Sequence, residues 1–178
     1  DLVIEENKTR GEGQKKLYVM FDQMYWHLTY GSIQHYNPVS LRPEMKEYTI
    51  FIDAISKVFA ATGVRVGWSM GPAAIINKMK AILTHIGAWA PMAEQKAVAQ
   101  YLADREGIKK YLAHFKSEIL ERLQRIYEGF SALKSEGFAV EAIAPEAAIY
   151  LTIKLDLVGK KTAEGMVLVA QSDVTAYL

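Results

Sequence analysis

Short apolar runs separated by long helical stretches are the feature that most restricts the fold of this chain. Residues 17–21 (LYVMF) are an unbroken apolar run, residues 48–52 (YTIFI) are a β-branched and aromatic run, and each stops at an aspartate. Runs of this kind are typical of strands buried on both faces, as in a parallel sheet. Residues 64–68 are a possible third strand. The pattern therefore predicts an α/β fold with a three-layer α/β/α, mostly parallel sheet.

The second half of the chain has helical spacing. Residues 73–86 predict one helix, and a long helical tract from Met92 is expected to break near Gly107 and to end at Gly137. Its apolar positions recur every three or four residues, so we expect this stripe to pack on the sheet rather than on a partner. Residues 138–143 and 148–153 predict a pair of strands, and residues 163–178 predict a helix.

Charge and composition exclude several functions. With 21 Lys and Arg against 20 Asp and Glu, the net charge is +1, which favours neither nucleic acid nor an anionic membrane surface as a partner. No apolar run is long enough to cross a membrane. The absence of cysteine excludes disulfides and a thiol nucleophile and agrees with a cytoplasmic location. The four histidines lack metal-ligand spacing, so no metal site is expected.

The chain reads as a fragment of a longer protein. It begins at Asp1, and the apolar positions of its last predicted helix still recur at Leu178, with no glycine, proline or basic turn to end that helix.

A lysine follows the second apolar run. Ser56 and Lys57 come where a parallel strand would end, which is the edge at which open α/β sheets bind ligands. An amine that acts as a nucleophile must lose its proton, and a nearby cation such as Arg65 favours that loss. The Arg65 guanidinium, between Gly63 and Gly67, also suits a phosphate. Taken alone, a lysine in this position is usually solvated.

Asp22 and Tyr25 follow the first apolar run. Two parallel strands would bring them toward Lys57, and a carboxylate buried there needs a cationic partner such as a protonated pyridine nitrogen. Singly, Asp22 suits a helix cap and Tyr25 a core aromatic. A carboxylate, a phenol, a lysine and an arginine on successive strand ends are less easily accidental.

Residues 54–67 (AISKVFAATGVRVG) resemble the lysine signature of the class I and II aminotransferases, the aspartate-aminotransferase-like branch of the fold-type-I pyridoxal-phosphate enzymes. The Asp-x-x-Tyr of Asp22 and Tyr25 resembles a second motif of that family. The sequence departs from the signature at Ala54, where the family usually has Gly or Ser. The resemblance implies that residues 1–114 are the second half of the coenzyme-binding large domain, and that residues 115–178 begin a small α+β C-terminal domain.

The resemblance also implies a role for each motif residue. Lys57 would form a Schiff base with pyridoxal 5'-phosphate (PLP) and then shuttle the substrate's α-proton. Asp22 would keep the pyridine nitrogen protonated, Tyr25 would donate to the ring's phenolic oxygen, and Arg65, with Ser56, would bind the phosphate.

The implied reaction is transfer of an amino group between an amino acid and a 2-oxo acid, in a protein that is a homodimer. The glycine-rich phosphate loop, the stacking aromatic and the substrate-binding arginine of the family cannot be assigned here, so we expect this fragment alone to be inactive. Two alternatives stay open, because the same fold and coenzyme serve several reactions. One is another fold-type-I PLP enzyme (a lyase, decarboxylase or synthase), and the other is a non-enzymatic truncated domain.

Overall fold

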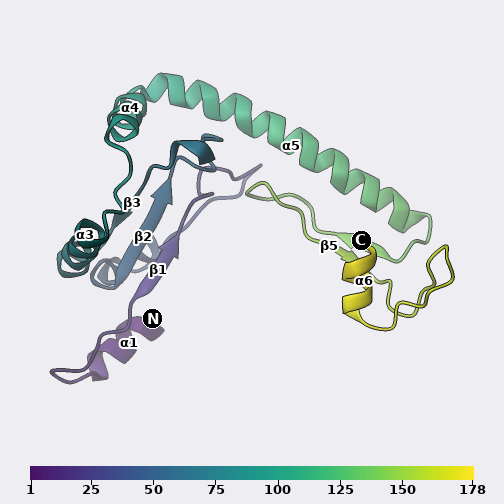
Figure 1. The fold of residues 1–178 in the computed structure, drawn as a ribbon, viewed down its shortest axis with the longest axis horizontal. Coiled ribbons are helices and arrows are strands. Elements are labelled where there is room, and N and C mark those ends of the chain that lie inside the picture. The colour runs from purple at the N-terminus through teal and green to yellow at the C-terminus, as the bar shows by residue number, and fades with distance from the viewer. The chain divides into compact units, whose positions relative to one another are not determined.

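Three strands form one sheet in the order β1-β2-β3 (Figure 1). The computed structural model describes all residues from 1 to 178. Strand β1 (Val19–Asp22) is parallel to β2 (Thr49–Ala54), with Asp22 opposite Ile52. Strand β3 (Gly67–Met70) is antiparallel to β2, with Gly67 opposite Ala54. The predicted third strand thus starts later, and it reverses direction because no crossover helix precedes it, only the 3-10 turn η2 (Thr62–Val64).

The two predicted strands differ in burial. In β2, residues Thr49, Asp53 and Ala54 are buried. In β1 half-buried and exposed positions alternate, and the Met20 side chain is 75% exposed. The prediction that the first run is buried on both faces is therefore wrong for β1 in this structure. The reason is its place at the edge of the sheet, where fewer neighbours cover it.

Short helices precede both parallel strands. Helix α1 (Leu2–Thr9) is held to the start of β1 by the buried Asn7, whose side chain exchanges two hydrogen bonds with the backbone of Leu17, at 2.7 and 2.8 Å. Helix α2 (Pro38–Leu41) and the 3-10 helix η1 (Pro43–Glu47) lie between β1 and β2. The Asn37 side chain caps α2, which explains this short helix.

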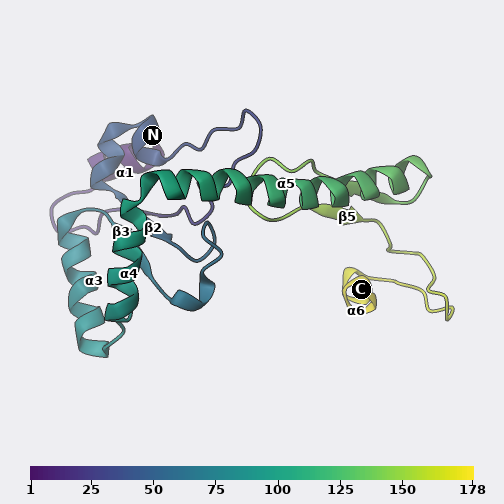
Figure 2. The ribbon, with the colours of Figure 1, turned by 90° about the horizontal axis from the view of Figure 1, so that it is seen from above.

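The long helices follow the sheet. Helix α3 (Ala73–Ile86) has the predicted bounds. The predicted tract is divided into α4 (Met92–Ala103) and α5 (Arg105–Ser135), and Figure 2 shows α5 as one continuous helix. The break lies at Asp104, slightly before the predicted Gly107, because the Asp104 carboxylate accepts a hydrogen bond from the backbone nitrogen of Gly107 and so caps the new helix.

The apolar core of the first part of the chain joins the sheet to α4. Ile55, Val66 and Val98 are buried together, and Phe59, Trp68 and Leu102 pack against them among other partly buried side chains. Phe59 also stacks on Tyr111 of α5, with ring centroids 5.8 Å apart. The connection between β2 and β3 is therefore anchored in the core by α4 and by Tyr111 in α5.

The chain divides into two units, Asp1–Lys116 and Ser117–Leu178, with α5 contributing to both. In the second unit, β4 (Val140–Ala142) and β5 (Ile153–Leu155) form an antiparallel pair. Strand β4 lies within the predicted range 138–143, whereas β5 overlaps the predicted range 148–153 only at Ile153. Helix α6 (Gln171–Tyr177) is shorter than the predicted helix over 163–178. Residues 161–167 instead form a turn closed by a bridge between Lys161 and Val167, with Gly165 at φ +87°. None of the helices combines the length and apolar character needed to cross a bilayer.

Candidate active site

Lys57 lies in a turn that directly follows β2. The next two residues pack in the core and hold this turn in place. Val58 is 1% exposed, and Phe59 contacts the rings of Tyr101 and Tyr111. Ser56 and Lys57 themselves are only half-buried. The backbone under Lys57 is thus held by the core while its side chain stays accessible, which is the arrangement that a reactive amine requires.

Arg65 lies at the same edge of the sheet as Lys57. Because β3 is antiparallel to β2, its first residue, Gly67, pairs with the last residue of β2, Ala54, and the backbone nitrogen of Ile55 donates to the carbonyl of Val66 at 3.4 Å. The exposed Arg65 donates from Nη1 to the carbonyl of Thr62 at 2.7 Å.

The backbone of Arg65 is unusual. Its φ of 60° and ψ of 38° are left-handed, and nearby Ala60 also has a positive φ, of 49°. Residues other than glycine pay for this conformation, so it is uncommon outside constrained turns and functional sites. The β2–β3 connection therefore holds strained backbone on the side of the sheet that carries Lys57.

Asp22 and Tyr25 lie at the end of β1. Asp22 is the last residue of that strand, it is exposed, and its Oδ1 accepts a hydrogen bond from the backbone nitrogen of Met24 at 3.1 Å. This contact closes a turn, and no helix follows directly for Asp22 to cap. Tyr25 is half-buried in the turn that follows. Since β1 and β2 are parallel neighbours, their carboxyl ends share one edge, and the segments carrying Asp22, Tyr25, Lys57 and Arg65 meet there.

Asp53 is a residue of this region that the sequence reasoning overlooked. It is 6% exposed, and its carboxylate accepts from the backbone nitrogen of Ala54 at 2.8 Å and from Trp26 Nε1 at 3.0 Å. Burial raises the pKa of Asp53, while hydrogen bonds from Ala54, Trp26 and the Gln23 side chain, together with His27, act in the opposite direction. The available signal was a carboxylate at the end of an apolar run, four positions before Lys57.

His27 belongs to the same cluster. Its ring stacks on Trp26 with centroids 3.6 Å apart. Burial lowers the pKa of His27, the Asp53 carboxylate raises it, and the positive charges of Lys116 and His35 lower it further. A half-buried imidazole therefore lies beside the buried carboxylate, close in the sequence to Tyr25.

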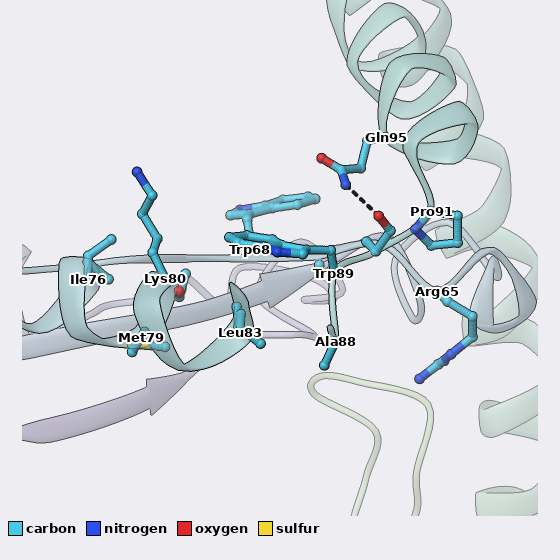
Figure 3. Close-up of a pocket in the computed structure, with 13 residues that line it drawn as sticks. Arg65, Trp68, Ile76, Met79, Lys80, Leu83, Ala88, Trp89, Pro91 and Gln95 are labelled. Carbon is cyan, nitrogen blue, oxygen red and sulfur yellow. Dashed lines mark hydrogen bonds between the residues drawn. The ribbon is translucent and has the colours of Figure 1, made fainter. Parts of the chain in front are cut away.

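A hollow in the first unit lies away from Lys57. It has a volume of about 630 Å³ and is lined by β3, α3 and the connection from α3 to α4. Arg65 is the only predicted site residue on its wall, and Figure 3 shows Arg65 at one end and Lys80 at the other, with Trp68 and Trp89 between them. The Gln95 side chain closes one wall by donating to the carbonyl of Ala90 at 2.6 Å. Because it lacks Lys57 and Asp22, we do not assign this hollow to the lysine chemistry.

Known structures have the same fold. The aspartate aminotransferase of Rhizobium meliloti superposes with a TM-score of 0.82 at 24% identity, covering 92% of this chain and 39% of that one. An aromatic aminotransferase of Pyrococcus horikoshii superposes with a TM-score of 0.67 at 29% identity, covering 76% of this chain and 34% of that one. These likenesses confirm the predicted α/β fold class of fold type I.

Curated relatives agree with the structures. A probable aspartate/prephenate aminotransferase of Thermus aquaticus is 30% identical over 138 residues, which is 78% of this chain and 34% of the relative. The aspartate aminotransferase of Geobacillus stearothermophilus is 31% identical over 134 residues, which is 75% of this chain and 32% of the relative. The chain thus spans about a third of the length of these relatives.

The family described as aminotransferase class I and II matches residues 13–174. With the lysine signature, the fold and the relatives in agreement, the chain belongs to the class I and II aminotransferases.

Proposed function

We propose that this chain is the coenzyme-binding part of a PLP-dependent aminotransferase, which moves an amino group between an amino acid and a 2-oxo acid. The observation that supports the proposal most is the common sheet edge of the segments that carry Lys57, Asp22, Tyr25 and Arg65. These residues come from two stretches of the chain, the turn after β1 and the connection between β2 and β3, and the pairing of β1 with β2 supports their lying at one edge.

The donor set at this edge fits PLP. The coenzyme presents an aldehyde, a pyridine nitrogen, a phenolic oxygen and a phosphate, and the edge presents an amine, a carboxylate, a phenol and a guanidinium. Lys57 and Ser56 are half-buried, and Asp22 and Arg65 are exposed, so these groups face space that a ligand can enter. The fit is therefore one of chemistry and accessibility.

In the proposed mechanism each residue would have a defined role. Lys57 Nζ would hold the coenzyme covalently and would move the proton that leaves the substrate's α-carbon. The Asp22 carboxylate would keep a proton on the pyridine nitrogen, and the Tyr25 hydroxyl would donate to the phenolic oxygen. Arg65, with help from Ser56, would hold the phosphate. When bound, the coenzyme supplies an electron sink for the charge that builds up at the α-carbon.

The domain division and the assembly are also proposals. We propose that residues 1–114 complete the large domain and that residues 115–178 begin the small one. Support comes from the division of the chain after Lys116. By the family resemblance, we further propose that the complete protein is a cytoplasmic homodimer. The names of the curated relatives make aspartate the first amino donor to test.

Borohydride trapping tests the role of Lys57. Reduction of the complete protein with PLP present should attach the coenzyme irreversibly to the peptide that contains Lys57, because borohydride reduces the carbon–nitrogen link of a bound lysine. Mass spectrometry of the digest locates the label. The variant Lys57→Ala should lose it, and Lys46→Ala, which removes an exposed lysine before β2, should keep it. A label on any other lysine contradicts the assignment.

The reaction type needs a separate measurement. A half-reaction with an amino acid and no acceptor should convert the coenzyme to its amine form, with one equivalent of 2-oxo acid, as seen by absorbance and product analysis. Release of ammonia or carbon dioxide instead would identify a lyase or a decarboxylase.

A further inference from the structure

The buried Asp53 carboxylate links two segments of the proposed site. Asp53 lies near the end of β2, four positions before Lys57, and Trp26 directly follows Tyr25. The bond from Trp26 Nε1 to Asp53 Oδ2 joins residues 27 positions apart. A second bond, from the backbone nitrogen of Gln23 to the carbonyl of Ile52 at 3.0 Å, joins the same two segments.

Both oxygens of this carboxylate are in use. Oδ1 accepts from the backbone nitrogen of Ala54 and Oδ2 accepts from the Trp26 indole. A buried carboxylate is costly unless such donors satisfy it, and its bonds are stronger than neutral ones because it is charged. If Asp53 contributed only to solubility, its side chain could lie exposed on the surface and would not need these two donors.

We propose that Asp53 is a positioning residue, which holds the turn of Asp22 and Tyr25 against the strand that leads to Lys57. The inference rests on the proposed function, since it concerns the relative placement of the coenzyme-binding side chains. Asp53 itself does not touch the coenzyme in this proposal. It acts through Trp26 on Tyr25, and through the backbone of Ala54 on the turn of Lys57.

Asparagine is a sharp probe because an amide offers only one acceptor oxygen. In Asp53→Asn the amide nitrogen must face either the Ala54 N–H or the Trp26 indole N–H, so one donor is left facing another. Trp26→Phe removes the indole donor and keeps an aromatic ring. In the double variant the asparagine oxygen can accept from the backbone nitrogen of Ala54, and no indole N–H faces the amide nitrogen. We therefore expect the double variant to be affected less than the sum of the two single variants.

The first measurement needs no coenzyme. In ¹H–¹⁵N spectra of the 178-residue chain, one of the three tryptophan indole signals should disappear in Trp26→Phe, and the same signal should shift in Asp53→Asn. Trp89→Phe is the matched control, because it removes a half-exposed indole that lines the hollow between β3 and α3. It should leave the Trp26 signal in place. An unchanged Trp26 signal in Asp53→Asn would overturn the proposal.

The second measurement is coenzyme affinity of the complete protein, followed through the absorbance of bound PLP. We expect Asp53→Asn and Trp26→Phe each to raise the dissociation constant about tenfold, as is common when a supporting hydrogen bond to a binding group is lost, with Trp89→Phe unchanged. Wild-type affinity in both single variants would overturn the positioning role and leave the proposed function intact. Failure of the wild-type protein to bind PLP would overturn both.

Discussion

Single residues in the first unit show how burial and charge compete. His27 is half-buried against Trp26 and faces one negative group, Asp53, and two positive groups, Lys116 and His35. Burial is the largest influence, and it lowers the pKa of His27 below its ordinary value of 6.5. The folded chain therefore binds fewer protons at His27 than the unfolded chain does.

This difference makes the stability of the fold depend on pH. Since the unfolded chain binds more protons at His27, acidification from pH 6.5 through the lowered pKa should reduce the free energy of unfolding, and that loss should be absent above pH 7. Asp53 acts in the opposite sense: burial raises its pKa above 3.8, so its contribution falls as pH rises through that raised value. The contribution of His27 must therefore be isolated by difference.

Urea unfolding of the wild type and His27→Gln between pH 5 and pH 8 isolates it. The wild type should lose stability relative to His27→Gln as pH falls below 6.5. His85→Gln, which replaces an exposed histidine on α3, is the matched control and should follow the wild-type curve. Parallel curves for the wild type and His27→Gln would show that His27 has the same proton affinity in both states.

At the scale of elements, the pairing of β2 and β3 depends on small residues. Gly63, Gly67 and Gly71 are spaced four apart, yet their surroundings differ. A Cβ on Gly71 would lie 2.9 Å from the carbonyl oxygen of Thr49 and 3.3 Å from Cα of Ile50. A Cβ on Gly63 would meet nothing within 4 Å.

Two alanine substitutions test this difference. We expect Gly71→Ala to destabilise the fold by about 1–3 kcal/mol, because backbone atoms of β2 must move to admit the methyl group. Gly63→Ala is the matched control and should change stability by less than about 0.5 kcal/mol. Both differences in the free energy of unfolding are measured from the midpoints of urea unfolding curves, with the same m-value for each variant. Equal effects of the two substitutions would mean that β2 and β3 adjust without cost.

The elements also show where sequence patterns succeed. The bounds of α3 were predictable because proline precedes it and Gly87, at φ 65°, follows it. The direction of β3 was not, since residues 64–68 have the same composition whichever way the strand runs. The prediction that β1 is buried on both faces also failed, because burial depends on which elements cover the strand.

At the scale of the whole molecule, this chain spans about a third of the length of its curated relatives. We expect the 178-residue chain alone to catalyse no measurable transamination, since a phosphate loop, a stacking aromatic and a substrate-binding arginine are not assignable in it. A coupled assay with aspartate and a 2-oxo acid, run beside the complete protein, measures this. Turnover by the isolated chain above the rate of a control without enzyme would refute the expectation.

The sequence by itself determined the local features of this protein. Apolar runs and helical spacing predicted the main strands and helices, and the segment around Lys57 and Arg65 with Asp22 and Tyr25 identified the family, because these signals lie within short stretches of chain. The roles of these residues stay predictions. Only the tertiary structure decided that β3 runs antiparallel to β2, which puts Arg65 at the sheet edge where Lys57 lies. It also decided that the Asp53 carboxylate accepts a hydrogen bond from the Trp26 indole. Those contacts join residues far apart in the chain, and no local pattern specifies which distant donor will meet a buried carboxylate.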